Sequence, residues 1–419
     1  MTEPISRPGR KNPVMRTRQA VLPPWTRSRV ALGMTAAAAE GRFELQQCAA
    51  CAAVQYPPRE ACHRCLSSEL PWVLQQSGGE LIAQTLLRHS NDLFFRERVP
   101  WRLGMVRLDC GPTVVVHLHG DVGPPPTRVR VTARLDRAGM AVLVGLPDQD
   151  VPNMADDRQL REMACNPKFR KVLITDGKSA VGQALVRALA AAGADLIWVG
   201  YAEPWKKFPG LAELSDLPQV SLVPLDVTDA RSVQQLAAEI GGKVDILVNN
   251  AEVHRAHGIG SRYGTETARS ELEVNYLGLL RLAQDFGPVM RARGADGQSS
   301  AVAWVNVLSV FALSSFPSHG TYSASKAAAH SLSQCLRAEM RPAGVRVVNV
   351  YPGPIDDDWN QLLPPPKLSP AALARSIVNA LNDGIEDIYP GDVAQEWLTR
   401  LRESPKALER ELAIGLGTV

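Results

Sequence analysis

The spacing of apolar and polar positions divides the chain into two parts of different character. Between residues 78 and 146, short runs of alternating or β-branched apolar residues are interrupted by glycine and proline. Such runs predict β-strands, and five in succession are typical of a small barrel. The expected strands are Glu80–Leu87, Trp101–Leu108, Thr113–His119, Arg128–Ala133 and Ala141–Leu146.

After Lys171 the pattern alternates between short apolar runs and longer stretches rich in alanine, leucine, arginine and glutamate. This alternation predicts right-handed βαβ units and a Rossmann-type, doubly wound parallel sheet. The fold class is therefore α/β, with a smaller β-rich part before the sheet. The expected strands are Val172–Thr175, Leu196–Val199, Val220–Pro224, Ile246–Val248, Ala301–Leu308 and Val345–Val350.

The remaining segments lack a sustained period. Residues 1–35 mix arginine, proline and threonine, so we expect a disordered or partner-ordered arm. A short helix over Thr35–Arg42 should lead into a cysteine-containing segment. The division that follows is the arm (1–35), the cysteine segment with its leading helix (36–76), the barrel (77–147), a polar linker (148–170) and the Rossmann-type part (171–419).

Composition limits the class of protein. A chain of 419 residues is longer than the roughly 250 to 300 residues that one hydrophobic core serves, so at least two domains are expected. With 45% hydrophobic residues, 21% charged residues and a formal net charge of +3, nothing favours a nucleic-acid or membrane partner. The sequence has neither an apolar run of about 18 residues nor a secretory signal, so we expect a cytoplasmic protein.

Four cysteines form two CxxC pairs, Cys48 with Cys51 and Cys62 with Cys65. Two such pairs supply four thiolates, the ligand set of a tetrahedral structural zinc site with no position left for catalysis. Four unrelated buried cysteines, or a redox dithiol, are the alternatives. One shared zinc ion explains the spacing of both pairs better than either alternative does.

These pairs, the Tyr-Pro-Pro-Arg between them and the strands that follow resemble the zinc-ribbon/OB-fold family that associates with thiolase-like enzymes acting on acyl-CoA. The resemblance covers residues 36–147 and implies a module that docks a thiolase-like partner, with the barrel helping to frame the acyl-CoA site. Ala52 departs from the family, which usually has glycine at this tight turn. OB barrels also bind single-stranded nucleic acid through aromatic platforms, but this barrel has few aromatic residues, so we expect no nucleic-acid partner.

Tyr322 and Lys326 are four residues apart in a helical stretch and so share one face of the helix. A phenol with an ordinary pKa near 10 is a poor acid–base catalyst at neutral pH, and a neighbouring ammonium favours its ionised form. Ser309 ends an apolar strand before Tyr322, and Asn275 lies on the preceding helix. The part of the chain after Lys171 thereby resembles the classical short-chain dehydrogenase/reductase family.

This second resemblance implies a role for each residue. Tyr322 is the general acid/base, Lys326 holds the nicotinamide ribose and lowers the tyrosine pKa, Ser309 hydrogen-bonds the substrate oxygen, and Asn275 anchors a proton-relay water. The implied cofactor is NAD(P), and family members usually form homo-oligomers through this domain. The cofactor-binding positions carried over are Thr175, Gly177, Lys178, Val181, Gly182, Asp226, Asn249, Ala251, Tyr322, Lys326, Pro352, Gly353 and Ile355.

The expected phosphate-binding loop departs from the family pattern of TGxxxGxG. Asp176 and Ala180 replace two glycines, whereas Gly182, which helix–strand packing needs, is retained. A carboxylate near a pyrophosphate weakens binding, and Lys178 could compensate for its charge. The loop therefore leaves two alternatives open, a working cofactor site and a site that has lost its cofactor.

Three positions outside the loop also depart. Gly200 lies where NAD-preferring members carry a carboxylate, which favours NADP slightly over NAD. Glu252 replaces the glycine of the family's NNAG motif, and Asp357 stands where members usually present a threonine to the nicotinamide.

The two halves together suggest an oxidoreductase that interconverts a β-hydroxyacyl-CoA and a β-ketoacyl-CoA beside a thiolase-like partner. One alternative is a non-catalytic scaffold for such a partner, and another is a stand-alone reductase acting on a ketone without CoA. Protein side chains filling the nicotinamide space, such as the carboxylate of Asp176 or Asp357, would favour the scaffold.

Overall fold

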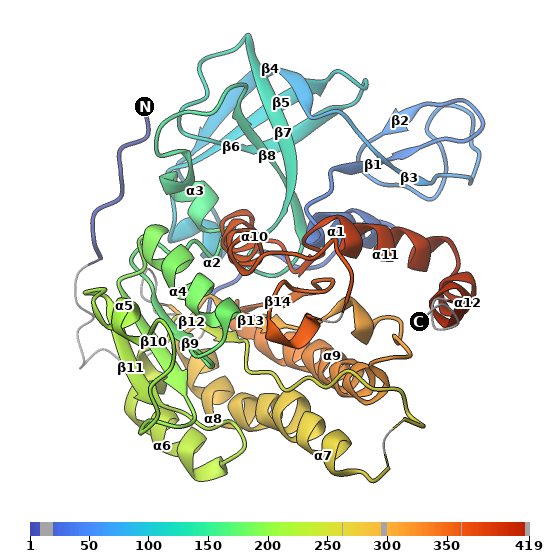
Figure 1. Cartoon of the computed structure of the whole chain (residues 1–419). Coiled ribbons are helices and arrows are strands. Elements are labelled where there is room, and N and C mark those ends of the chain that lie inside the picture. The colour runs from blue at the N-terminus through green and yellow to red at the C-terminus, as the bar shows by residue number, and fades with distance from the viewer. Residues whose placement is uncertain (9–19, 262, 295–299, 362, 415–419) are drawn as a thin grey trace. The chain divides into compact units, whose positions relative to one another are not determined.

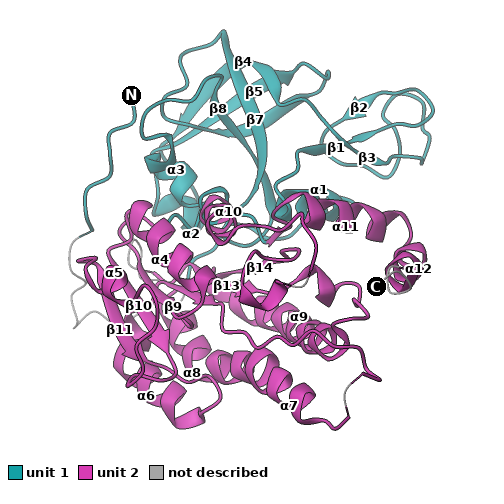
Figure 2. Cartoon of the chain, in the orientation of Figure 1, with its two compact units in different colours: residues 1–9, 20–166, 381–386 teal, residues 10–19, 167–380, 387–419 magenta. Residues whose placement is uncertain are grey.

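The computed structural model describes residues 1–8, 20–261, 263–294, 300–361 and 363–414 (Figure 1). Part of the expected N-terminal arm, residues 9–19, lies outside the described residues. The chain divides into two compact units, shown in Figure 2. Unit 1 comprises residues 1–9, 20–166 and 381–386, and unit 2 comprises residues 10–19, 167–380 and 387–419.

Unit 1 contains a closed five-stranded barrel with the strand order β4-β5-β6-β8-β7, so the expected barrel is confirmed. Alternate residues of its strands face the core. In β6, for example, Val114, Val116 and Leu118 are buried whereas Thr113 and Val115 are exposed. The strands are β4 (Gly78–Leu87), β5 (Trp101–Leu108), β6 (Thr113–Leu118), β7 (Thr127–Leu135) and β8 (Ala141–Pro147).

A separate three-stranded antiparallel sheet carries the cysteine segment. Its order is β2 (Val54–Gln55), β1 (Glu44–Gln47) and β3 (Trp72–Leu74). It is preceded by α1, which spans Leu32–Ala39.

The expected helix over Thr35–Arg42 is therefore wrong by three residues at each end. The helix ends early because Gly41 adopts a left-handed φ of 75°, a conformation that glycine accepts without strain. The N–H groups of Gly41 and Arg42 then bond to the carbonyls of Ala38 and Ala37. This is the glycine-terminated helix end known as a Schellman motif.

Residues 148–166, expected as a polar linker, pack against the barrel. Gln159 accepts a hydrogen bond from the backbone N–H of Arg102 at 2.7 Å and donates one to the carbonyl of the same residue at 3.0 Å. Leu160 and Met163 join an apolar cluster with Trp101. The region contains the short helices η1 (Met154–Asp156) and α3 (Arg158–Arg161), and another short helix of unit 1, α2 (Leu93–Arg96), lies between β4 and β5.

Unit 2 is built on a seven-stranded parallel sheet with the order β11-β10-β9-β12-β13-β14-β15, which confirms the Rossmann-type fold. The strand order reverses between β9 and β12, and such a reversal opens a crevice at the carboxyl ends of the strands. The strands are β9 (Lys171–Ile174), β10 (Leu196–Tyr201), β11 (Val220–Pro224), β12 (Ile246–Asn249), β13 (Ala303–Val307), β14 (Arg346–Val350) and β15 (Asp387–Ile388).

Helices alternate with these strands along the chain (Figure 1). A six-residue π-helical segment, η3 (Glu273–Gly278), separates α7 from α8. None of the helices in the described part of the chain combines the length with the hydropathy that crossing a membrane requires. The α-helices are α4 (Ala180–Ala191), α5 (Leu211–Ser215), α6 (Ala230–Ile240), α7 (Glu266–Leu272), α8 (Leu279–Ala292), α9 (Gly320–Met340), α10 (Pro370–Asp383), α11 (Asp392–Glu403) and α12 (Pro405–Ile414).

Candidate active site and metal site

Tyr322 and Lys326 lie on the first turns of α9, as the sequence predicts. Both side chains are almost completely buried. The Nζ atom of Lys326 donates a hydrogen bond to the carbonyl of Val307, the last residue of β13, at 3.0 Å. The ammonium also lies 5.6 Å from the centre of the Tyr322 ring. The end of β13 therefore fixes the lysine beside the phenol.

Ser309 follows β13 and is buried beside the same phenol. Its hydroxyl accepts a hydrogen bond from the N–H of Phe311 at 3.2 Å. Ser309 also hydrogen-bonds to Tyr322, which opposes the rise of the tyrosine pKa. The structure thus brings together three of the four residues expected to act in catalysis.

Asn275 lies in the π-helical segment and acts on the cluster indirectly. Its side-chain amide accepts from the N–H of Val253 at 3.0 Å and donates to the carbonyl of Val253 at 2.9 Å. It also donates to the hydroxyl of Ser325 at 2.9 Å, one residue before Lys326 on α9. The amide therefore joins the chain after β12 to the catalytic helix, and its role as anchor of a relay water stays a prediction.

Glu252 contacts both catalytic side chains, and the sequence analysis did not place it among the site residues. Its Oε2 atom lies 2.6 Å from Nζ of Lys326 and accepts a hydrogen bond from the hydroxyl of Tyr322 at 3.1 Å. Burial acts to raise the pKa of Glu252, but the charge of Lys326 and the hydrogen bonds outweigh it and hold the pKa below its ordinary value. The only sequence signal was the loss of glycine at the end of the Asn249–Glu252 motif.

The pKa of Tyr322 is raised well above its ordinary value, first by burial and then by the charge of Glu252. In the arrangement observed, burial and the charge of Glu252 prevail, so the expectation that Lys326 lowers this pKa stays a prediction for a site without the Glu252 contact. His254 stacks on the phenol, with ring centres 4.0 Å apart and planes at 18°. Burial lowers the pKa of His254 and so favours the neutral imidazole.

The expected phosphate-binding loop leads from β9 into α4 and is held by residues 249–251, at the end of β12 and directly after it. Thr175 accepts hydrogen bonds from the N–H groups of Asn250 and Ala251, each at 3.0 Å. Its hydroxyl also donates to the side chain of Asn249 at 3.2 Å. Thr175, Asn249 and Ala251, all expected to contact the cofactor, therefore lie together at the crevice.

The two glycines of the loop, Gly177 and Gly182, sit where a side chain would not fit. A Cβ atom at Gly177 would lie 2.0 Å from a methyl of Val199, and one at Gly182 would lie 1.9 Å from the carbonyl oxygen of Asp176. The hydroxyl of Ser179 accepts a hydrogen bond from the N–H of Gly182 and caps α4. The close approach of loop and helix places the first turn of α4, which includes Val181, at the crevice, as anion binding at a helix N-terminus requires.

Asp176 adds a carboxylate to this helix end. It accepts a hydrogen bond from the N–H of Lys178 at 2.9 Å. Burial raises the pKa of Asp176, and hydrogen bonds from Lys178 and Ser179 oppose the rise. The ammonium of Lys178 pairs instead with Glu203 at 2.9 Å, so compensation of Asp176 by a direct ion pair is not observed.

The remaining cofactor-binding candidates follow the ends of β11 and β14. Asp226 accepts hydrogen bonds from the N–H and hydroxyl of Thr228 at 2.9 and 2.7 Å. Pro352, Gly353 and Ile355 follow β14.

Two departures noted in the sequence have a structural basis. At Gly200, a Cβ atom would lie 2.8 Å from the carbonyl oxygen of Thr175, so the site has no room for the carboxylate of NAD-preferring members. Asp357 caps the short helix η7 (Asp358–Asn360) by accepting from two of its N–H groups. The carboxylate that contacts Tyr322 and Lys326 is therefore that of Glu252 and not that of Asp357.

These residues suit the two ends of a dinucleotide unequally, since the α4 end is open to it and the Tyr322–Lys326 end is occupied by Glu252. The α4 end offers a compact, glycine-lined approach to helix N–H groups, which suits a pyrophosphate. The Tyr322–Lys326 end suits a ribose once the Glu252 carboxylate has moved away from Lys326 Nζ.

The four cysteines converge in unit 1, as expected for a metal site. Their sulfur atoms all lie within 4.8 Å of one another. Cys48 and Cys65 approach to 3.5 Å, and Cys51 and Cys62 to 3.6 Å. A zinc–sulfur bond of about 2.3 Å implies sulfur separations of about 3.8 Å at the corners of a tetrahedron, so the donor set fits one zinc ion.

The turns around the cysteines support this arrangement. The N–H of Arg64 donates to the sulfur of Cys62 at 3.4 Å. Ala52, which replaces the family's glycine, takes a left-handed φ of 57°. The tight turn that the family builds with glycine is therefore present here with alanine.

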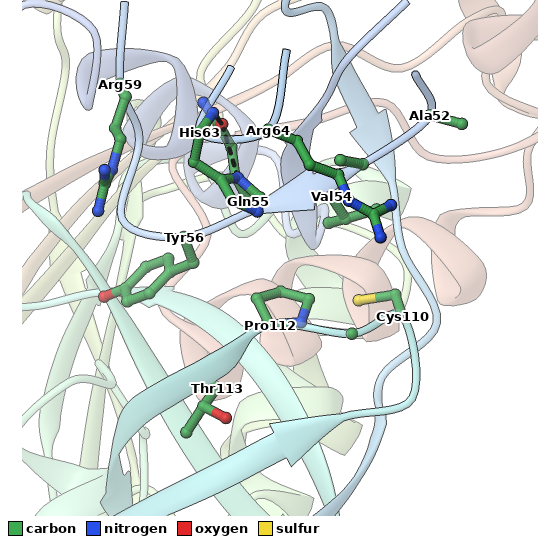
Figure 3. Close-up of a pocket in the computed structure, with 12 residues that line it drawn as sticks. Ala52, Val54, Gln55, Tyr56, Arg59, His63, Arg64, Cys110, Pro112 and Thr113 are labelled. Carbon is green, nitrogen blue, oxygen red and sulfur yellow. Dashed lines mark hydrogen bonds between the residues drawn. The ribbon is translucent and has the colours of Figure 1, made fainter. Parts of the chain in front are cut away.

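A cavity of about 650 Å³ lies between the cysteine segment and the barrel of unit 1 (Figure 3). Arg59, His63 and Arg64 line it from the cysteine segment, and residues 110–113 line it from the turn between β5 and β6. No acidic side chain is among the described residues that line it. The cavity is therefore suited to a ligand that carries negative charge.

Comparison with known protein families agrees with both units. A family described as short chain dehydrogenase matches residues 170–366. The zinc ribbon domain described as ChsH2, rubredoxin-like, matches residues 35–71, and the ChsH2 C-terminal OB-fold domain matches residues 72–146.

Individual relatives match the second unit. The short-chain dehydrogenase ptmH of Penicillium ochrochloron is 34% identical over 215 residues, covering 47% of this chain and 70% of the relative. An uncharacterized oxidoreductase of Staphylococcus aureus (strain USA300) is 29% identical, covering 50% of this chain and 89% of the relative.

Two solved structures resemble the chain. A short chain dehydrogenase from Burkholderia cenocepacia J2315, in complex with NADP, is 33% identical with a TM-score of 0.53, and the match covers 59% of this chain and 98% of that one. A short-chain dehydrogenase from Streptomyces avermitilis is 26% identical with a TM-score of 0.50, covering 60% and 100% of the two chains.

Proposed function

The chain belongs to the short-chain dehydrogenase family, and we propose that it is an NAD(P)-dependent oxidoreductase interconverting a β-hydroxyacyl-CoA and a β-ketoacyl-CoA. The observation that carries this proposal is the buried cluster of Tyr322, Lys326 and Ser309 at the end of β13. Ionisable side chains gathered in a buried cluster, with a pKa moved far from its ordinary value, are typical of a functional site.

Each side chain of the cluster has a defined task. When bound, the nicotinamide ring supplies a carbon that gives or takes a hydride at the β-carbon of the substrate. The hydroxyl of Ser309 orients the substrate oxygen, and the hydroxyl of Tyr322 gives that oxygen a proton during reduction or takes one during oxidation. Lys326 holds the ribose and, once free of Glu252, favours the phenolate.

NADP is the proposed cofactor in preference to NAD. The reason is Gly200 at the end of β10, where a larger side chain would strike Thr175 and Leu225. Without a carboxylate at this position, a phosphate on the adenosine ribose meets no repulsion from it.

The acyl-CoA substrate and a thiolase-like partner are proposed from unit 1. Its zinc ribbon and OB-fold domains are of the ChsH2 kind, and a set of four cysteine ligands suits a structural zinc rather than a catalytic one. The basic lining of the cavity in unit 1 is consistent with a ligand rich in phosphate, such as CoA. Fusion to the dehydrogenase would raise the local concentration of the shared thioester.

Titration of the full-length protein with NADPH and with NADH by calorimetry tests the proposal. We expect saturable binding of at least one cofactor, with NADPH the tighter. Absence of saturable binding at millimolar concentrations of both cofactors, in the wild type and in Glu252→Ala alike, would overturn the oxidoreductase.

A second candidate function is a scaffold that supports a thiolase-like partner without catalysis of its own. The observation that favours it is the contact between Glu252 and Lys326 at 2.6 Å, since this carboxylate uses a donor that a ribose would need. The same titration separates the two candidates, because a scaffold need not bind either nucleotide.

A further inference from the structure

Glu252 makes the contacts with Lys326 and Tyr322 that a bound cofactor is expected to make. A lysine ammonium has three donors, and two of those on Lys326 are taken by the carbonyl of Val307 and the carboxylate of Glu252. The same carboxylate accepts the hydroxyl hydrogen of Tyr322. A ligand that approached this pair would therefore compete with Glu252 for both side chains.

The competition is strong because the contacts are shielded from water. Lys326 is 2% exposed and Tyr322 is 4% exposed, and the side chain of Glu252 is 19% exposed. At such positions a charge pair is weakly screened, so separating the partners leaves a charge that another group must satisfy. A polar ligand that reaches Lys326 can supply that group.

The side chain of Glu252 is the movable part of this contact, because the backbone on either side is held. The N–H of Ala251 donates to the hydroxyl of Thr175, and the N–H of Val253 donates to Asn275, both at 3.0 Å. His254 offers a second position for the carboxylate, since its Nδ1 atom lies 4.0 Å from the other oxygen of Glu252. Neither nitrogen of His254 has a hydrogen-bond partner in the described part of the chain.

We propose that Glu252 is a displaceable internal competitor of the cofactor, which holds Tyr322 and Lys326 in the free protein and lowers the affinity for nicotinamide nucleotides. This inference rests on the oxidoreductase function proposed above. It makes Glu252 a specificity-determining residue of the site. To displace the carboxylate, a ligand must offer Lys326 a contact at least as favourable as the one it replaces.

Two substitutions test the proposal at different levels. Glu252→Ala removes the side chain, and the backbone tolerates alanine because Glu252 is not among the described residues with positive φ. Glu252→Gln keeps the shape and removes the charge. Glu409→Ala, which removes an exposed carboxylate of α12 paired with Lys406, is the matched control.

Binding of NADPH to each full-length protein is measured by calorimetry, after thermal unfolding has shown that each variant is folded. We expect Glu252→Ala to bind NADPH at least about fivefold more tightly than wild type, within the usual range of coupling between competing interactions. Glu252→Gln should lie between the two, and the control should match wild type.

The possible failures are distinguishable. Measurable but equal affinities in wild type, Glu252→Ala and Glu252→Gln would overturn the competitor role and leave the oxidoreductase standing. Saturable binding by Glu252→Ala alone would support the competitor role and set wild-type affinity below the detectable range. Failure of every variant to bind would overturn both proposals.

Discussion

The phenol of Tyr322 lies beside a pair of opposite charges, the ammonium of Lys326 and the carboxylate of Glu252, which contact each other. Burial, and after it the charge of the nearer carboxylate, raises the pKa of the tyrosine. An acid–base catalyst works best when its pKa lies near the working pH. The free protein is therefore in a resting arrangement, and departure of Glu252 is what would make Tyr322 an effective catalyst.

His117 gives unit 1 a dependence on pH. The indole N–H of Trp101 donates to Nδ1 of His117 at 2.8 Å, and burial lowers the pKa of this histidine to about 4. In the unfolded chain the pKa is about 6.5. As pH falls below that value, the unfolded chain takes up a proton that the folded chain does not, so stability is lost between pH 6.5 and 4.

We therefore predict that the contribution of His117 costs unit 1 about 2 kcal/mol of unfolding free energy between pH 7 and pH 5. Urea unfolding of wild type and His117→Gln at the two pH values measures it. The variant should lose less stability by about this amount, whereas His89→Gln, at an exposed position, should behave as wild type. Equal losses of stability in wild type and His117→Gln would contradict the prediction, because they would show that folding does not lower the pKa of His117.

At the scale of elements, several strands could be predicted directly from short runs of apolar residues. The bounds of β5 and β11 were predicted to the residue. Strand β15 was not predicted, because two residues carry no period. The predicted bounds of helix α1 were wrong because its end depends on the left-handed Gly41 and its Schellman hydrogen bonds. Helical spacing alone does not encode these features.

The candidate site, too, was predictable only where its residues lie close together in the sequence. Spacing on one helix placed Tyr322 and Lys326 together, and spacing within one segment paired the cysteines. Glu252 and Lys326 are distant in sequence, and their contact depends on how the crevice brings the end of β12 to α9. No local pattern records such a contact.

The turn from β9 into α4 carries its own prediction, because Asp176 places a carboxylate where a pyrophosphate would lie. Asp176→Asn keeps an acceptor for the N–H of Lys178 and removes the charge. We expect NADPH to bind more tightly by about 1 kcal/mol, or about fivefold, in a calorimetric titration. Asp216→Asn, at an exposed helix end, should change nothing. An unchanged affinity in Asp176→Asn would place the pyrophosphate away from α4.

At the scale of the whole molecule, the chain joins a metal-binding half to a dehydrogenase half. In the function proposed above, the four thiolates of unit 1 and the tyrosine–lysine pair of unit 2 have different tasks, since the thiolates would close a structural metal site and the pair would act on a substrate. Zinc loss should therefore affect unit 1 and leave the chemistry of unit 2 in place.

We predict about one zinc ion per wild-type chain by atomic absorption, and none in Cys48→Ser/Cys51→Ser, because two thiolates cannot close the tetrahedral site. Cys335→Ser, at an exposed cysteine outside the cluster, should retain the metal. The double variant should become sensitive to protease between residues 48 and 65 while its NADPH affinity is unchanged. Full zinc content in the double variant would refute the ligand assignment.

The central claim is that Tyr322 moves the proton of an alcohol–ketone interconversion. The most direct measurement is NADPH consumption with a β-ketoacyl-CoA by wild type and by Tyr322→Phe at matched cofactor saturation. We expect saturable consumption by wild type and a loss of at least about a hundredfold in kcat for the variant, with little change in NADPH affinity. A variant that turns over at the wild-type rate would contradict the claim.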